Sequence, residues 1–367
     1  SVVDSVHGGE LSQLLQNESL ALADAQSALA LEWDSVQSPG LYCKTIGILL
    51  TSPSGDRSRT IELAQDAVRK FPDTSEVWVK LGQAHTDPIE KIASYRRAMK
   101  LNPTRTAVMK LLSDLLLSQA QVDDAIALFE HGIELGQGSG NGNAEFWKAH
   151  AEFLSRLDDA QQRLTAAIAK YPERSEYYEA RGMLFVDKNR IDEALGDFKS
   201  AFKMTDVVDK LGNRIASRAG KLSDERRPAD AITIAELARD HGADGVRLDV
   251  ALCQANLKLE RYEEALAHIN SAIEKDTEEE HYWLHKLKAE ADFALGQFEQ
   301  ALADLAKAIE LNPKDGSSLY WIPPDLVAQC PDQAFRDGML KLADDMVDNA
   351  DSAYVRIGRA GLLAAFG

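Results

Sequence analysis

Four segments along the chain share one arrangement of apolar and polar positions. In each, apolar or small residues recur at positions i, i+4, i+7 and i+8, which places them on one face of an α-helix. The segments are 121–137, 190–206, 261–277 and 297–313. Three of them begin with acidic residues, which the positive end of the helix macrodipole favours. We therefore predict amphipathic helices that each bury one face.

Alanines in these helices and between them recur at a regular spacing. They are separated by 35, 34, 37, 34 and 36 residues, and each is followed seven residues later by another small residue. The alanines are Ala125, Ala160, Ala194, Ala231, Ala265 and Ala301. Small side chains at a fixed position allow the next helix to approach closely. A period near 34 is typical of a helix–turn–helix repeat, so we predict a stacked array.

The repeat resembles the tetratricopeptide repeat family over most of the chain. The family's second-helix pattern of a small, a bulky and a small residue followed by proline is present as Ala301, Leu305, Ala308 and Pro313. Its first-helix pattern is present in part as Trp78, Leu81, Gly82 and His85. The resemblance implies an all-α fold, a right-handed superhelical solenoid of tetratricopeptide-like helix–turn–helix repeats.

Two units are shorter than the family pattern. Trp78 to Pro103 and Trp147 to Pro172 each span 25 residues, about three fewer than the pattern requires. Both units therefore need a shorter turn, which resembles the half-a-TPR variant of the repeat. Because that variant is common in RNA-processing scaffolds, the resemblance leaves an RNA-processing role open.

The pattern also predicts how the chain is divided. We count about nine units over residues 1–320, with degraded outer units, since terminal repeats cap the stack. A second helix is predicted over 19–33, a turn over 52–59 and a flexible connection over the glycine-rich stretch 136–143. Residues 321–335 contain three prolines and cannot form a continuous helix. We predict that 321–367 form a loop and capping helices.

Charge changes the picture of possible partners. The formal net charge is −18, which argues against a general affinity for nucleic acid. Residues 52–110 nevertheless carry 11 basic and 7 acidic side chains, whereas residues 261–315 carry 6 and 13. This polarity suits a charged partner laid along the array or head-to-tail self-association. A solvated surface with an incidental bias is the alternative.

The sequence identifies no compartment, although it favours a soluble, cytoplasmic protein. No stretch approaches 18 consecutive apolar residues, so no membrane span is predicted. The chain begins at Ser1, and its apolar ending, 358–367, resembles a helix stopped midway. We therefore expect part of a longer protein, with a removed leader as the alternative. Cys43, Cys253 and Cys330 form no CxxC pair, and Cys253 is predicted to be a buried structural thiol.

Motifs that carry chemistry are missing from the sequence. His281 and His285 are spaced i, i+4 and could face one metal ion, but Tyr282 stands where a zinc hydrolase would place its glutamate. There is no nucleophile elbow, Walker loop, CxxCH or EF-hand loop. We predict no metal site, no cofactor and no enzymatic activity.

In arrays of this family the first helices line a concave groove, and the resemblance therefore selects their groove positions as partner-binding candidates. These residues are Lys80, Gln83, Lys110, Asp114, Glu179, Met183, Gln254, Trp283, Lys286, Glu290 and Phe293, with Lys148, Glu152 and Lys258 at equivalent positions. Trp283 and Phe293 would be large rings on an exposed face, as interaction hot spots often are. Alternatively, Trp283 packs against the neighbouring first helix.

One specificity of the family can be compared directly. Members that bind chaperone C-terminal tails need a Lys and Asn pair at two of these positions, and none is present, so chaperone tails are not predicted partners. The alternation of lysine and acidic residues favours a mixed or basic peptide. We predict a non-catalytic protein–protein interaction scaffold that binds a peptide or partner helix in the groove. A scaffold of an RNA-processing complex and a docking or regulatory module of a larger enzyme are the alternatives.

Overall fold

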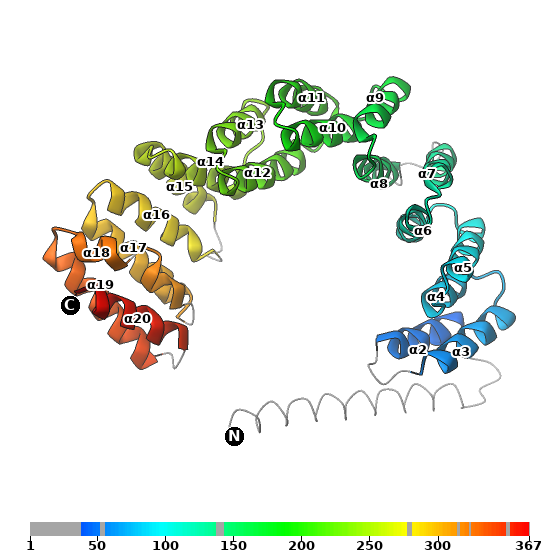
Figure 1. Cartoon of the computed structure of the whole chain (residues 1–367), viewed down its shortest axis with the longest axis horizontal. Helices are drawn as coiled ribbons and strands as arrows, with labels where there is room; N and C mark the ends of the chain where they lie inside the picture. The colour runs from blue at the N-terminus through cyan, green and yellow to red at the C-terminus, as the bar shows by residue number, and fades with distance from the viewer. Residues whose placement is uncertain are drawn as a thin grey trace. The chain divides into compact units, whose positions relative to one another are not determined.

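The computed structural model describes residues 38–51, 56–136, 143–276, 281–313, 316–322, 324–349 and 353–366, and the elements in these ranges are all helical (Figure 1). They form two compact units, up to Leu157 and from Asp158 onward. None of the described helices is both long and apolar enough to cross a membrane. The boundary predicted at residue 320 does not coincide with this division and stays a prediction.

Helices follow one another with short connections in both units. Unit 1 contains α2 (Pro39–Thr51), α3 (Arg57–Lys70), α4 (Ser75–Ala84), α5 (Pro88–Leu101), α6 (Thr106–Ser118), α7 (Val122–Gly136) and α8 (Asn143–Ser155). Unit 2 begins with α9 (Ala160–Lys170), α10 (Ser175–Asp187), α11 (Ile191–Met204), α12 (Val208–Asp224) and α13 (Pro228–Asp240). It continues with α14 (Val246–Lys258), α15 (Tyr262–Lys275), α16 (Trp283–Ala294), α17 (Phe298–Leu311), η2 (Gly316–Tyr320), α18 (Pro324–Gln329), α19 (Gln333–Asn349) and α20 (Ala353–Phe366).

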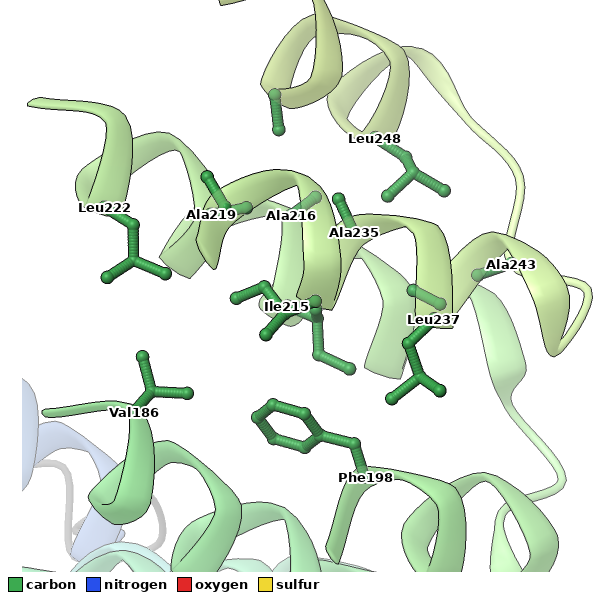
Figure 2. Packing of buried hydrophobic residues seen from close by; sticks show 14 of the residues in the cluster. Val186, Phe198, Ile215, Ala216, Ala219, Leu222, Ala235, Leu237, Ala243 and Leu248 are labelled. Carbon is green, nitrogen blue, oxygen red and sulfur yellow. The ribbon is translucent and has the colours of Figure 1, made fainter. Parts of the chain in front are cut away.

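The repeated alanines lie in the core, as the sequence predicts. All six are at most 3% exposed, and the earlier Ala67 and Ala98 are fully buried. In unit 2, Phe198 of α11 packs among Ile215 of α12 and Leu237 of α13, in one cluster that runs from α10 to α14 (Figure 2). The pairs α10–α11 and α12–α13 therefore share one core with α14, and the predicted all-α array of helix–turn–helix repeats is confirmed.

The turn inside most helix pairs is built on one left-handed residue. Each such residue stands five positions before the repeated alanine and has a φ between 57° and 74°. They are Ala120, Asn189, Arg226, Glu260 and Gly296. The next residue then donates its backbone N–H to a carbonyl five residues earlier, as Arg190 does to Phe185 at 2.8 Å. This is the Schellman ending of a helix, which normally uses glycine.

The two short units lack that turn. Within the described residues 75–101 and 143–170, neither the α4–α5 nor the α8–α9 connection contains a left-handed residue. After α4 the chain leaves in an extended conformation at His85, and Asp87 caps α5 through the backbone N–H of Glu90. Removing the Schellman turn is how these units shorten, which agrees with the half-a-TPR-like spacing.

The C-terminal elements share a core with the last clear repeat. Phe293 of α16, Phe298 of α17 and Phe335 of α19 form an aromatic cluster with ring centroids 5.3 to 5.8 Å apart. Leu319 of η2 is fully buried in the same core. Residues 321–335 are not a continuous helix, as their prolines predict.

Three local predictions lie wholly or partly outside the described residues, and one of them also differs from the structure. The helix predicted over 19–33 lies outside the described residues, as do 52–55 and 137–142. The turn predicted over 52–59 is too long, because α3 already begins at Arg57. Its start is fixed by the Asp56 side chain, which accepts the backbone N–H groups of Ser58 and Arg59.

Candidate functional site

Two neighbouring first helices of unit 1 carry candidate charges on one surface. Lys110 of α6 lies 3.3 Å from Glu152 of α8, and Asp114 of α6 lies 2.6 Å from Arg156, just after α8. Lys148 lies 3.8 Å from Glu152 on α8 itself. All five side chains are about half exposed. The predicted groove charges of this part of the array therefore pair with one another across adjacent helices.

An apolar side chain stands beside these charges. Leu111 follows Lys110 on α6 and is 42% exposed, although leucine is usually buried. It lies three residues before Asp114 and therefore on the same side of the helix. We call Lys110, Leu111, Asp114, Lys148, Glu152 and Arg156 the α6–α8 face. It presents three cations, two carboxylates and one apolar side chain.

The candidates on α4 are less exposed than those of the α6–α8 face. Lys80 Nζ donates to the Gln83 side-chain oxygen at 3.3 Å, and both residues are half-buried. The Lys80 ammonium also approaches Gly47 of α2, where a β-carbon would lie 3.6 Å from it. These two candidates contact each other and the preceding helix.

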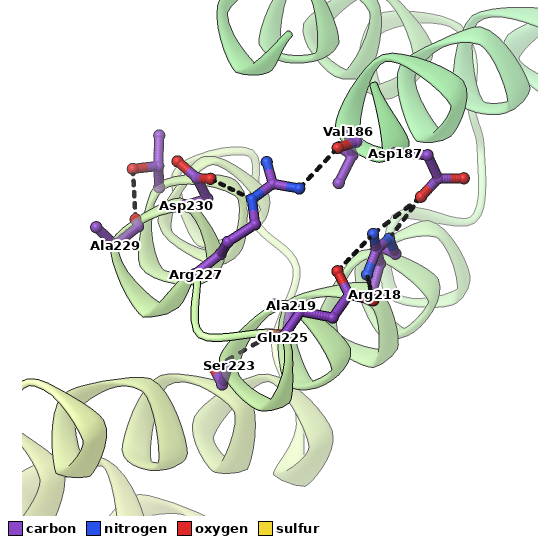
Figure 3. A network of polar contacts seen from close by, with 10 residues as sticks. Val186, Asp187, Arg218, Ala219, Ser223, Glu225, Arg227, Ala229 and Asp230 are labelled. Atoms are coloured by element: carbon purple, nitrogen blue, oxygen red, sulfur yellow. Dashed lines mark hydrogen bonds and ion pairs between the residues drawn. The ribbon is translucent and has the colours of Figure 1, made fainter. Parts of the chain in front are cut away.

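In unit 2, ion pairs between neighbouring first helices likewise connect α10 to α12. The carboxylate of Glu179, a candidate on α10, accepts hydrogen bonds from Nε and a terminal nitrogen of Arg214 on α12. About two turns further along α10, Asp187 accepts a hydrogen bond from Arg218 Nε at 3.0 Å. Arg218 also binds Glu225 (Figure 3). The guanidinium groups of α12 therefore neutralise the carboxylates that α10 presents.

Two further candidates are partly withdrawn from the surface. Met183 of α10 packs against the unit 2 core. Gln254 of α14 lies beside α12, with its side-chain oxygen 3.7 Å from where a β-carbon on Gly220 would stand. Gln254 therefore lies against the neighbouring first helix, α12.

The candidates on α16 are covered by the chain itself. Lys286 is only 4% exposed; its Nζ donates to Ser317 Oγ at 2.7 Å and lies 4.5 Å from the centre of the Trp321 ring. Burial raises the pKa of Glu290, while the nearby Lys258 charge and then Trp321 act to lower it. The buried Trp321 indole nitrogen nevertheless makes no hydrogen bond of normal geometry to any residue that the structure describes.

The two aromatic candidates on α16 also have internal contacts. Trp283 is half-buried against the core between α14 and α16, and its ring meets His281 edge-on at 5.6 Å. Phe293 belongs to the cluster with Phe298 and Phe335. The expectation of two large rings on an exposed face therefore needs correction. The elements after α17 supply packing partners that a repeat pattern does not include.

Sequence reasoning did not select Arg156, Arg214, Trp321 or Leu111. Arg156 and Arg214 could have been found from charge, because each stands one repeat away from a carboxylate at a groove position. Leu111 occupies a groove position by the family pattern and could have been chosen for its side chain. No sequence signal connects Trp321 to α16, since it lies outside the periodic region.

Structural contacts account for the histidine pair singled out above and for two of the cysteines. His281 contacts Asp276 at 2.7 Å and His285 contacts Asp304 at 2.8 Å, so the pair has separate partners. The described residues contain no group of three or more metal-ligating side chains that could hold a metal ion. Burial raises the pKa of Cys43 to about 11 and that of Cys253 to about 12, which leaves both as inert thiols.

Comparison with known proteins agrees with this architecture. A family model described as tetratricopeptide repeat matches residues 150–204, and a second with the same description matches 287–315. No curated protein matches the chain. The chain therefore contains tetratricopeptide-like repeats. Proteins with such repeats are generally non-catalytic and bind protein or peptide partners.

Several solved structures are similar to the chain. YrrB, described as a TPR protein with an unusual peptide-binding site, is 19% identical, with 54% of this chain and 97% of YrrB covered and a TM-score of 0.39. Yeast Tom70 is 15% identical, with 96% and 93% covered and a TM-score of 0.35. The Cut9–Hcn1 structure is 12% identical, with 92% and 65% covered and a TM-score of 0.36. At these values the similarities support no inference about partner or activity.

Proposed function

We propose that this array of tetratricopeptide-like repeats is a non-catalytic scaffold that binds a short segment of a partner protein on the α6–α8 face. The observation that carries the proposal is the exposure of Leu111 beside a row of half-exposed charges. An apolar side chain surrounded by polar groups is the usual anatomy of a binding hot spot.

The charges of this face indicate the chemistry of the segment. Its three cations outnumber its two carboxylates, and Glu152 is shared between Lys110 and Lys148. One cation is therefore available to a partner carboxylate at low cost. The net charge of −18 repels a long acidic run. The segment that fits best carries an apolar residue next to one or two carboxylates.

A matched pair of variants tests this proposal. The first combines Leu111→Ala with Lys110→Gln. The second combines Ile89→Ala with Lys100→Gln, which removes one exposed apolar residue and one exposed lysine from α5 in the same unit. Circular dichroism would first establish that both variants fold as the unchanged chain does.

Random 12-residue peptides would be displayed and selected on the purified chain, and the affinity of the enriched peptides would be measured by fluorescence anisotropy. We expect enriched peptides to combine an apolar residue with a carboxylate. The α6 variant should weaken them about tenfold, since a central anchor contributes more than ~1 kcal/mol. The α5 variant should leave them unchanged. Equal weakening by both variants, or by neither, would overturn the proposal.

The basic segment 52–110 gives the RNA-processing alternative less support than its composition indicates. Arg57 donates to the backbone carbonyls of Gln83 and His85, and Arg96 pairs with Asp124 at 2.7 Å. Arg105 pairs with Glu76. A labelled single-stranded RNA at low salt in the same anisotropy assay tests this alternative, because RNA binding falls steeply with rising salt.

A further inference from the structure

A pocket in unit 2 is lined by residues other than the first-helix candidates. It has a volume of about 360 Å³ and is formed by the end of α13, the following loop, the first turn of α14 and α15. Its lining residues are Arg239, Gly242, Ala243, Asp244, Asp249, Ala267, His268, Ser271 and Lys275. The pocket combines small residues with a concentration of hydrogen-bond donors.

A buried carboxylate arranges those donors. Asp249 is 1% exposed, and its two oxygens accept from three side chains. Arg239 donates at 2.5 Å, Lys275 at 2.6 Å and Ser271 at 2.9 Å. Because one carboxylate holds both cations, their charged groups remain at the pocket without the entropy cost of ordering them on binding.

The histidine of the pocket has a defined hydrogen-bonding role. Burial, followed by the Arg239 charge, lowers the pKa of His268. Its Nδ1 lies 3.3 Å from a terminal nitrogen of Arg239, and a guanidinium can only donate. Nδ1 is therefore the acceptor, and the proton of the neutral ring is on Nε2. The neutral ring therefore lines the pocket without adding a charge.

The pocket already contains one oxyanion that the chain supplies. The Asp244 carboxylate is bound by Lys275 and accepts the backbone N–H of Gly245 at 3.0 Å. The hydrogen bond from Lys275 lowers the pKa of Asp244, which is therefore ionised at neutral pH. Asp244 is nevertheless 73% exposed. An exposed ion pair of this kind is weak and exchanges readily with solvent.

We propose that this pocket is an oxyanion-binding site, in which Arg239 and Lys275 hold an external carboxylate or phosphate group and Asp244 is its built-in competitor. The Asp244 carboxylate marks the position that the ligand oxygens take. Asp249 stays in place and keeps both cations aligned. Binding here uses α13 to α15 of unit 2, so that it is independent of the α6–α8 face in unit 1.

The test removes the competitor without disturbing Asp249. In Asp244→Asn the amide can no longer neutralise Lys275, whereas Glu274→Gln removes an equal charge from an exposed position outside the pocket lining. Lys275→Gln removes one of the two cations. Each protein, as the full chain labelled with ¹⁵N-glycine, would be titrated with inorganic phosphate and separately with acetate, following the amide signals of Gly242 and Gly245.

We expect saturable shifts of these two signals with at least one of the two anions. Asp244→Asn should tighten binding by up to about fivefold, which corresponds to the loss of one exposed ion pair. Glu274→Gln should leave the affinity unchanged, and Lys275→Gln should abolish binding. Binding of phosphate alone assigns the pocket to phosphoryl groups, and binding of acetate alone assigns it to carboxylates.

Two results would overturn the proposal. One is the absence of site-specific shifts with both anions in Asp244→Asn, the variant with the least competition. The other is an equal gain in affinity for Asp244→Asn and Glu274→Gln, which would show a general effect of charge. Both of these variants change exposed side chains, so the comparison stands even where Lys275→Gln loosens the fold.

Discussion

Two glycines in adjacent helices of unit 2 allow the close packing of these helices to be tested. The same substitution to alanine is crowded at one glycine and has free space at the other. A β-carbon on Gly182 of α10 would lie 2.6 Å from one ring carbon of Phe198 and 2.8 Å from another. Phe198 is fully buried in the core of unit 2 (Figure 2). A β-carbon on Gly196 of α11 would have no atom of the described residues within 4 Å. Gly182→Ala and Gly196→Ala should therefore differ in sign.

The expected magnitudes follow from two opposing contributions. Replacing glycine by alanine inside a helix gains about 1 kcal/mol at either position. Ordinary contact begins at 3.4 Å, so that the new methyl group in Gly182→Ala is 3.4 − 2.6 = 0.8 Å too close to the ring. Overpacking of this kind typically costs about 1–3 kcal/mol. Since the helix contribution cancels between the two variants, their difference in unfolding free energy isolates the steric cost.

Urea unfolding followed by circular dichroism would measure this difference. We expect Gly196→Ala to be about 1 kcal/mol more stable than the unchanged chain, and Gly182→Ala to be about 1–3 kcal/mol less stable than Gly196→Ala. Adding Phe198→Leu to Gly182→Ala should cost less than Phe198→Leu alone, because the smaller side chain accepts the methyl group. If Gly182→Ala is as stable as Gly196→Ala, the close approach of α10 and α11 is not a constraint and the reasoning fails.

Three further predictions concern the stability of the chain, and the first two use the same urea unfolding. Asp197→Ala should cost about 3 kcal/mol, because it removes the carboxylate that Arg181 binds at 2.7 and 2.8 Å and leaves this largely buried guanidinium with only the Thr165 hydroxyl as a hydrogen-bond partner among the described residues. Glu260→Gly should stabilise by about 0.5–1 kcal/mol and Gly296→Ala should destabilise by a similar amount, since both occupy the left-handed turn position. Burial raises the pKa of Glu290, so its contribution to stability is present below the ordinary value of 4.5 and is lost as the pH rises through the raised pKa. Glu290→Gln should therefore gain stability relative to the unchanged chain as the pH rises above 4.5, and the gain should level off above the raised pKa, measured by thermal melting; a difference that is the same at every pH would contradict this.

The repeat period and the buried face could be predicted because they depend on residues within one helix and its neighbour. Ala265 and Ala301 were identified by spacing, and both are fully buried. The left-handed turns were harder to predict, because only Gly296 shows the usual glycine. At Arg226 and Glu260 the two helices pack firmly enough to impose a conformation that their side chains disfavour. Tertiary packing therefore decided the backbone where local preference opposed it.

The candidate surface was predicted less completely, because contacts between elements distant in the sequence leave no periodic pattern. A periodic pattern identifies which positions share a face, but not which side chains from other elements reach that face. Lys286 was selected as a groove residue, and its contacts with Ser317 and Trp321 come from a segment without any repeat pattern. Phe293 also occupies a predicted groove position, and Phe335 of α19 packs against it. Both errors arise from elements beyond the last repeat.

Alternating lysine and acidic residues at groove positions can stabilise the array through internal ion pairs, and they can also contribute specificity for a partner. The α6–α8 face is compatible with both roles. Each exposed pair, such as Lys110 with Glu152, stabilises the array by at most ~1 kcal/mol, so that a partner carboxylate can replace Glu152 at small cost. Replacing an internal ion pair by an equivalent pair with the partner adds specificity to binding but little affinity. Leu111 has no such internal partner to lose, and covering its exposed surface is a net gain. We therefore expect Leu111→Ala to weaken a selected peptide more than Lys110→Gln does, and the reverse order would mean that charge alone holds the partner.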